Sequence, residues 1–94
     1  MARLRYSDAS KADLKQIARV ISQDKPIAAR KCVAKIREKC RLVARHPDIG
    51  DQRPELGENI RSTYLGSYVI FFRRTNGTVE IVRVIRGDRD TQTL

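Results

Sequence analysis

Five consecutive apolar residues, Tyr68-Val69-Ile70-Phe71-Phe72, constrain the fold of this chain more than any other segment. They belong to a β-like run that is followed by Asn76-Gly77 and by a second run, Val79 to Arg86. Asn-Gly between two such runs is the strongest short-range signal for a β-hairpin. A similar run, Asn59 to Tyr64, precedes them, so we predict a three-stranded antiparallel meander.

Two amphipathic helices are predicted before the meander. Apolar residues recur at three- and four-residue spacing within residues 8–23, where Ser7 or Ser10 can serve as the N-cap. Pro26 suits the first turn of a second helix, which continues until His46-Pro47. Arg3 to Tyr6 alternates basic and apolar side chains, as a short strand does.

These elements predict an α+β fold in the order β-α-α-β-β-β, with a helical hairpin packed on an antiparallel sheet. Residues 47–57 are rich in turn formers and are predicted to form a connecting loop. We expect residues 1–94 to form one domain. A strand that is apolar throughout needs cover on both faces, and the helices cover only one. We therefore predict an apolar groove on the other face that a partner fills; the alternative is that sheet curvature and the long loop close it.

The net charge of +9 is concentrated in the N-terminal half. Residues 1–46 contain thirteen basic and four acidic residues, whereas residues 47–94 contain seven of each. Lys25 to Arg45 holds eight basic residues and one acidic residue, Glu38. Such dense like charge favours a polyanionic or acidic partner, although a solvated helical surface is the alternative.

Several classes of protein are disfavoured by the sequence. No apolar run approaches the ~18 residues of a membrane-spanning helix and no signal peptide is evident, so we expect a cytoplasmic protein. Cys32 and Cys40 would lie roughly 12 Å apart along one helix, too far apart for a disulfide. The single histidine, His46, has no neighbouring ligand pair, so we expect neither a metal site nor a cofactor.

The order of elements and several local motifs resemble the RelE/ParE superfamily of type II toxins, and within it the ParE branch. The resemblance covers nearly the whole chain and rests on these residues: Ser10, Ala12-Asp13-Leu14, Ala28-Ala29, His46-Pro47-Asp48-Ile49-Gly50, Ile60-Arg61, Gly66 to Arg73, and Val79 to Asp90.

The resemblance implies a cognate antitoxin with an acidic, ParD-like C-terminal segment that wraps the toxin, in a possible hetero-oligomer. Such a segment would cover the apolar sheet face and neutralise the positive charge of the second helix. The candidate antitoxin-binding residues are therefore Lys31, Lys35, Tyr68, Ile70, Phe72, Val82 and Val84.

The resemblance leaves two kinds of function open. RelE-like members cut messenger RNA on the ribosome, whereas ParE-like members poison DNA gyrase without catalytic chemistry. Ribonuclease members usually place a tyrosine or histidine just after the final strand, where this chain has Gly87-Asp88-Arg89-Asp90-Thr91-Gln92-Thr93-Leu94. We therefore predict no catalytic residue and a gyrase poison; a ribosome-dependent ribonuclease and a plain nucleic-acid-binding domain are the alternatives. The candidate target-binding residues are Arg61, Arg83, Arg86 and Arg89, because arginine offers fixed, bidentate donors.

Overall fold

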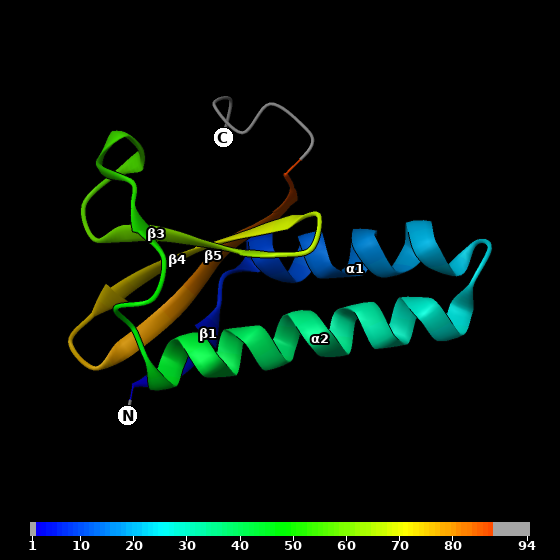
Figure 1. Cartoon of the computed structure of the whole chain (residues 1–94), viewed down its shortest axis with the longest axis horizontal. Coiled ribbons are helices and arrows are strands. Elements are labelled where there is room, and N and C mark those ends of the chain that lie inside the picture. Colours follow the sequence, from blue (N-terminus) through cyan, green and yellow to red (C-terminus); the bar gives the residue numbers. More distant parts are fainter. Residues whose placement is uncertain (1, 88–94) are drawn as a thin grey trace.

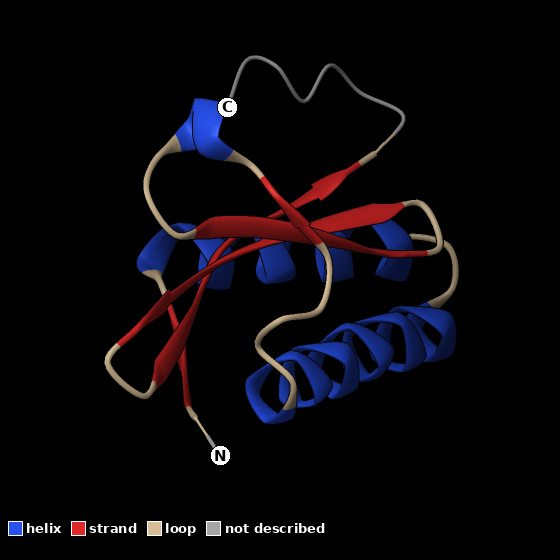
Figure 2. Ribbon diagram, turned by 60° about the vertical axis from the view of Figure 1, so that its left-hand side comes forward, coloured by secondary structure: helices blue, strands red, loops and turns tan. Residues whose placement is uncertain are grey.

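A computed structural model describes residues 2–87 of the chain. Two helices cover one face of a five-stranded sheet (Figures 1 and 2). In chain order the elements are β1 (Arg3–Tyr6), α1 (Asp8–Ser22), α2 (Pro26–Arg45), β2 (Asp51–Gln52), the 3-10 turn η1 (Pro54–Leu56), β3 (Ile60–Leu65), β4 (Tyr68–Thr75) and β5 (Thr78–Arg86).

The predicted order of the main elements is confirmed, and β3, β4 and β5 form the predicted antiparallel meander. The sheet has the strand order β1-β5-β4-β3-β2 and is mixed, because β1 pairs with β5 in parallel. The loop predicted for residues 47–57 contains the two-residue strand β2 and the turn η1. These elements had no local signal, since β2 exists only through its pairing with Arg61 and Ser62 on β3.

The helix boundaries follow from local chemistry. The side chain of Ser7 caps α1 by accepting a hydrogen bond of 3.0 Å from the backbone N–H of Ser10. Pro26 occupies the first turn of α2, where its missing N–H leaves no acceptor unsatisfied. His46 ends α2 immediately before Pro47, because a residue that precedes proline is disfavoured in the helical conformation.

The main core lies between the helices and the sheet. It contains Leu14, Ile36, Cys40 and Val43 from the helices together with Ile70, Phe72, Ile81 and Val84 from β4 and β5. Strict alternation along β5 predicts that Ile81 and Val84 face opposite sides, but both are in this core. The reason is a β-bulge: Phe71 pairs with Arg83 and Phe72 pairs with Ile81, so that Val82 is skipped.

The other face of β4 is not open, so the predicted apolar groove is wrong there. Val69 and Phe71 point away from the helices and are only 2% and 1% exposed. The guanidinium carbon of Arg53, in the loop between β2 and β3, lies 5.7 Å from the centre of the Phe71 ring. A hydrogen bond of 3.3 Å to the Ser62 hydroxyl holds Arg53 there. The long loop thus closes this face, as the alternative interpretation of the sequence expected.

Candidate functional site

A groove with an apolar floor and a basic rim runs between α1 and α2 on the outer side of the helical hairpin. It has a volume of about 720 Å³. Its floor is formed by small apolar residues of both helices, among them Ala18, Ala29 and Val33. Its rim carries four cations, Lys15, Arg19, Arg30 and Arg37, and none of the residues lining the groove is acidic.

The groove continues as a smaller hollow of about 340 Å³ towards Tyr6 and Lys11. Arg37 borders both, and its guanidinium carbon lies 5.4 Å from the centre of the Tyr6 ring. An apolar floor with cations on both sides is complementary to an amphipathic helix whose polar flanks are acidic. We call this surface, from Arg30 to Lys11, the helical groove.

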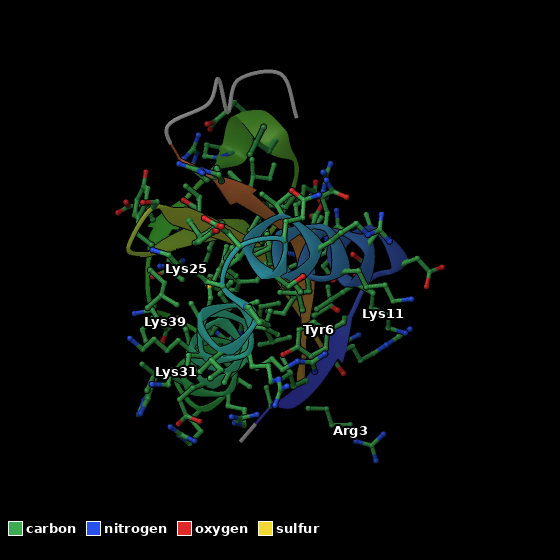
Figure 3. The ribbon with its side chains drawn as sticks, turned by 90° about the vertical axis from the view of Figure 1, so that its right-hand side faces the viewer. Arg3, Tyr6, Lys11, Lys25, Lys31 and Lys39 are labelled. Atoms are coloured by element: carbon green, nitrogen blue, oxygen red, sulfur yellow. The ribbon has the colours of Figure 1, made fainter. Side chains whose placement is uncertain are left out.

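Lys31 and Lys35 do not line the helical groove. Together with Lys39 they recur every four residues along α2, and all three lie outside the groove. Figure 3 shows Lys31 and Lys39 on the side of α2 opposite Tyr6. We call these three residues the lysine ridge. In the structure from Ala2 to Gly87, none of the three forms an ion pair or a hydrogen bond through its side chain.

A second cleft, of about 310 Å³, lies between α1 and the C-terminal half of β5. It brings together four residues that the sequence singled out: Tyr68, Arg83, Val84 and Arg86. Apolar side chains of α1 complete its wall, namely Ile17, Val20 and Ile21. Val20 is among the few large apolar side chains that are more than half exposed in the described part of the chain.

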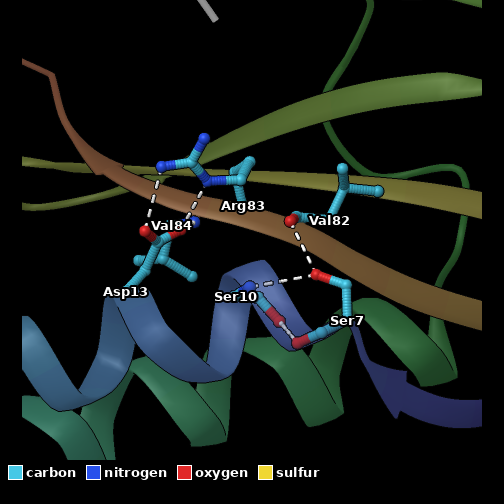
Figure 4. Close-up of polar contacts among 6 residues, drawn as sticks. All are labelled: Ser7, Ser10, Asp13, Val82, Arg83 and Val84. Atoms are coloured by element: carbon cyan, nitrogen blue, oxygen red, sulfur yellow. Dashed lines mark hydrogen bonds and ion pairs between the residues drawn. The ribbon is translucent and has the colours of Figure 1, made fainter.

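Asp13 organises the edge of this cleft (Figure 4). Its carboxylate accepts hydrogen bonds of 2.8 and 3.0 Å from the Arg83 guanidinium and one of 2.9 Å from the backbone N–H of Val84. The ion pair raises the pKa of Arg83 further. Ser7 acts on the same edge, because its hydroxyl donates to the Val82 carbonyl over 2.8 Å. The pairing of β1 with β5 ends at Ile81. Beyond that residue, the side chains of Ser7 and Asp13 bond to the edge of β5 in place of a strand.

Sequence reasoning missed this role of Asp13 and Ser7. Ser7 was considered only as a possible N-cap and Asp13 was not expected to contact β5, because contacts across seventy residues leave no local pattern. Arg83, which was predicted to bind a target, therefore forms its ion pair with Asp13 on α1.

Arg61 lies on β3, away from this cleft, and anchors a loop. Its guanidinium donates to the carbonyl oxygens of Asp48, Ile49 and Gly50 over 2.8, 3.2 and 3.1 Å. Arg61 and Arg74 border a separate cavity of about 560 Å³, and Arg74 pairs with the Asp48 carboxylate at 2.9 Å. The structure thus does not bring Arg61 together with Arg83 and Arg86. Arg89 lies outside the described residues.

Three of the apolar candidates for antitoxin binding are buried within the chain itself. Ile70 and Phe72 are 0% exposed and Val84 is 2% exposed. The expectation that they line an open surface is wrong, because the helices cover that face and the bulge at Val82 turns Val84 towards them. Tyr68 and Val82 are only partly buried.

Cys40 in the core and Tyr6, which is partly buried against the core, have strongly shifted pKa values. Burial raises the pKa of Tyr6 to about 12, and the charge of Cys40 and a hydrogen bond to Cys40 raise it to a smaller extent. Burial also raises the pKa of the Cys40 thiol to about 11. Both groups are therefore protonated near neutral pH, and neither is suited to proton transfer there.

Residues 2–87 contain no group of three His, Cys, Asp or Glu side chains placed to hold a metal ion. Neither described helix is long and apolar enough to cross a membrane.

The fold defines the class of protein. It matches a solved structure described as the chromosomal ParDE TA system from P. aeruginosa, with a TM-score of 0.78, 25% identity, and coverage of 92% of this chain and 96% of that one. It also matches the toxin-antitoxin complex RelBE2 from Mycobacterium tuberculosis, with a TM-score of 0.69, 21% identity and 90% coverage of both chains. The chain thus has the fold of the ParE and RelE toxins.

The sequence narrows this class to a family. Residues 4–91 match the profile of the "ParE toxin of type II toxin-antitoxin system, parDE". The chain therefore belongs to the ParE toxin family. No curated protein sequence gave a significant match.

Proposed function

We propose that this ParE-family toxin acts in the cytoplasm by binding and inhibiting DNA gyrase, and that a cognate antitoxin neutralises it. Family membership over residues 4–91 carries this proposal. The neighbouring solved structures are toxin–antitoxin systems, which supports an antitoxin as the partner.

The helical groove is the proposed docking site for the antitoxin. Its floor offers apolar contacts and its rim offers four cations, so an acidic amphipathic helix would bury its apolar side and pair its carboxylates. The remaining antitoxin contacts that we propose are the partly buried side chains of Tyr68, on β4, and Val82, on β5. Lys31 and Lys35, outside the groove, would act mainly through long-range attraction.

The second cleft is the proposed target surface. It presents Arg86 beside the exposed Val20 and the partly buried Ile17 and Ile21 of α1, and a cation next to an apolar patch is a frequent composition of protein-binding sites. Trapping one state of a large enzyme requires differential affinity and no chemical step.

The test combines growth with two biochemical readouts. Expression of the chain alone should stop growth, and co-expression with the antitoxin encoded next to it should restore growth. The purified chain should inhibit gyrase supercoiling, and Arg86→Ala should weaken this inhibition in a variant that circular dichroism shows to be folded. Cleavage of ribosome-bound messenger RNA with unaffected gyrase would establish the RelE-like alternative instead.

A further inference from the structure

We propose that the lysine ridge, Lys31, Lys35 and Lys39, is a separate binding surface for the phosphate backbone of duplex DNA. This inference goes beyond the proposed function, because it concerns a surface outside the helical groove and does not depend on gyrase as the target.

The geometry of the ridge is linear and cationic. Its three lysines recur every four residues on a straight helix, so their backbones lie about 6 Å apart and the ridge is about 12 Å long. Duplex DNA carries one charge per ~1.7 Å of its axis when both strands are counted, so a duplex segment of this length carries about seven phosphate charges, about half of them on each strand. Arg45, one turn beyond Leu42, adds a fourth cation at the end of the ridge.

The charges of the ridge are available to a ligand. The one acidic residue of α2, Glu38, is already paired with Arg41 at 2.7 Å. The hydrogen bond from Arg41 lowers the pKa of Glu38. Lys31 and Lys35 are exposed, and Lys39 is partly buried beside Leu42.

The composition of the ridge favours a polyanion over a protein. Protein interfaces are depleted in lysine and need apolar or aromatic anchors near their centre. Between Lys31 and Lys39 the described structure shows no large apolar side chain that is exposed; Ile27, one turn earlier, is the nearest. A row of solvated ammonium groups instead matches phosphate binding, in which released counterions supply the free energy.

The same surface is poorly suited to single-stranded RNA. Proteins bind unpaired bases by stacking them on aromatic side chains. Within residues 2–87, the exposed aromatic residue is Tyr64, which lies on β3 and not on α2. The helical groove, with its apolar floor, is likewise a worse site for phosphates, because it would remove water from them without replacing their hydrogen bonds.

The experiment measures how the affinity for a fluorescent 20-base-pair duplex depends on salt concentration. The variant Lys31→Gln/Lys35→Gln/Lys39→Gln keeps helix propensity and should reduce the slope of log K against log[salt] by about 2.7, or 0.9 for each phosphate that a lysine no longer neutralises. The single variant Lys35→Gln should reduce the slope by about 0.9. The matched control, Lys15→Gln/Arg19→Gln/Arg30→Gln, removes the same charge from the helical groove and should reduce the slope by less than about 1.

Circular dichroism and thermal unfolding verify that all variants are folded. Equal reductions for the ridge and groove variants would overturn the proposal, because binding would then follow net charge alone. An unchanged slope in the ridge variant would overturn it as well. Tighter, ridge-dependent binding of single-stranded RNA at the same salt concentration would overturn the assignment to DNA.

Discussion

Asp13 on α1 and Arg83 on β5 form a two-pronged ion pair that joins the helical hairpin to the edge of the sheet (Figure 4). The same carboxylate accepts the backbone N–H of Val84, so it holds both the side chain and the main chain of β5. The side chain of Asp13 is only 15% exposed, which protects these bonds from water. This contact fixes α1 at the proposed target cleft.

Replacing Asp13 with alanine should lower the free energy of unfolding by about 2 to 3 kcal/mol, because a hydrogen bond to a charged group contributes about 1.5–3 kcal/mol and the Val84 N–H loses its acceptor. Urea unfolding followed by circular dichroism measures this. The control is Glu38→Gln, which breaks the exposed pair with Arg41 and should cost less than about 1 kcal/mol. Equal losses in the two variants would show that Asp13 is an ordinary surface residue.

The loop that follows α2 should be sensitive at Gly50. Its φ of +83° belongs to the left-handed region, and an added Cβ would overlap the backbone carbonyl of Ser62. We expect Gly50→Ala to cost at least about 2 kcal/mol, since backbone strain and the overlap add. Gly66→Ala is the matched control: its φ is +56° and the space around it is open, so only the strain of about 1 kcal/mol should appear. Thermal unfolding of both variants measures the two losses of stability.

Arg61→Ala should loosen the same loop, because three carbonyl oxygens would lose their donor. Hydrogen exchange at Gly50 and Asp51 should become faster while exchange in the helices stays unchanged. A variant that keeps native exchange in this loop but loses gyrase inhibition would instead restore Arg61 as a target-binding residue, as the sequence predicted.

Charge reversal should separate the helical groove from the lysine ridge in antitoxin binding. Arg19→Glu/Arg30→Glu places acidic groups on the groove rim, so the antitoxin should both associate more slowly and dissociate faster. Lys31→Glu/Lys35→Glu changes the same charge outside the groove and should slow association only, most clearly at low salt. Surface plasmon resonance resolves the two rates. Faster dissociation from the ridge variant alone would move the docking site to the ridge.

The sequence predicted the elements that have a strong local signal. Asn76-Gly77 marked the hairpin, and Pro26 and Pro47 marked the limits of α2, because turn and cap chemistry is decided within a few residues. Strand β2 was not predictable in this way, since Asp51 and Gln52 acquire their conformation only from β3.

The site was predicted less well, because its geometry depends on two long-range features. The bulge at Val82 reversed the expected orientation of Val84, and Arg53 covers Phe71 on the sheet face where an apolar groove was predicted. The basic charge of α2 was visible in the sequence, yet its division into a groove rim and a separate ridge required the packing of α1 against α2. Arg83 likewise could be assigned only after Asp13 was found beside it.

Stability should fall at alkaline pH because of Cys40, in the core, and Tyr6, which packs against the core; their pKa values are raised to about 11 and about 12. In the unfolded chain these groups ionise near their ordinary values of 9.0 and 10.0. Between pH 9 and pH 12 the folded state therefore holds more protons than the unfolded state, so the free energy of unfolding decreases as pH rises. Well below pH 9 both groups are protonated in the folded and in the unfolded state, so they do not change the free energy of unfolding with pH there.

The loss attributable to Cys40 should be on the order of 2 kcal/mol by pH 11, since one pKa unit corresponds to about 1.4 kcal/mol. Urea unfolding at pH 8 and pH 11 measures it. Cys40→Ala should reduce the difference between the two pH values, whereas Cys32→Ala, at a partly buried thiol on the same helix, should leave it unchanged. If the Cys40→Ala variant retains the full alkaline loss, the buried thiol does not cause the pH dependence.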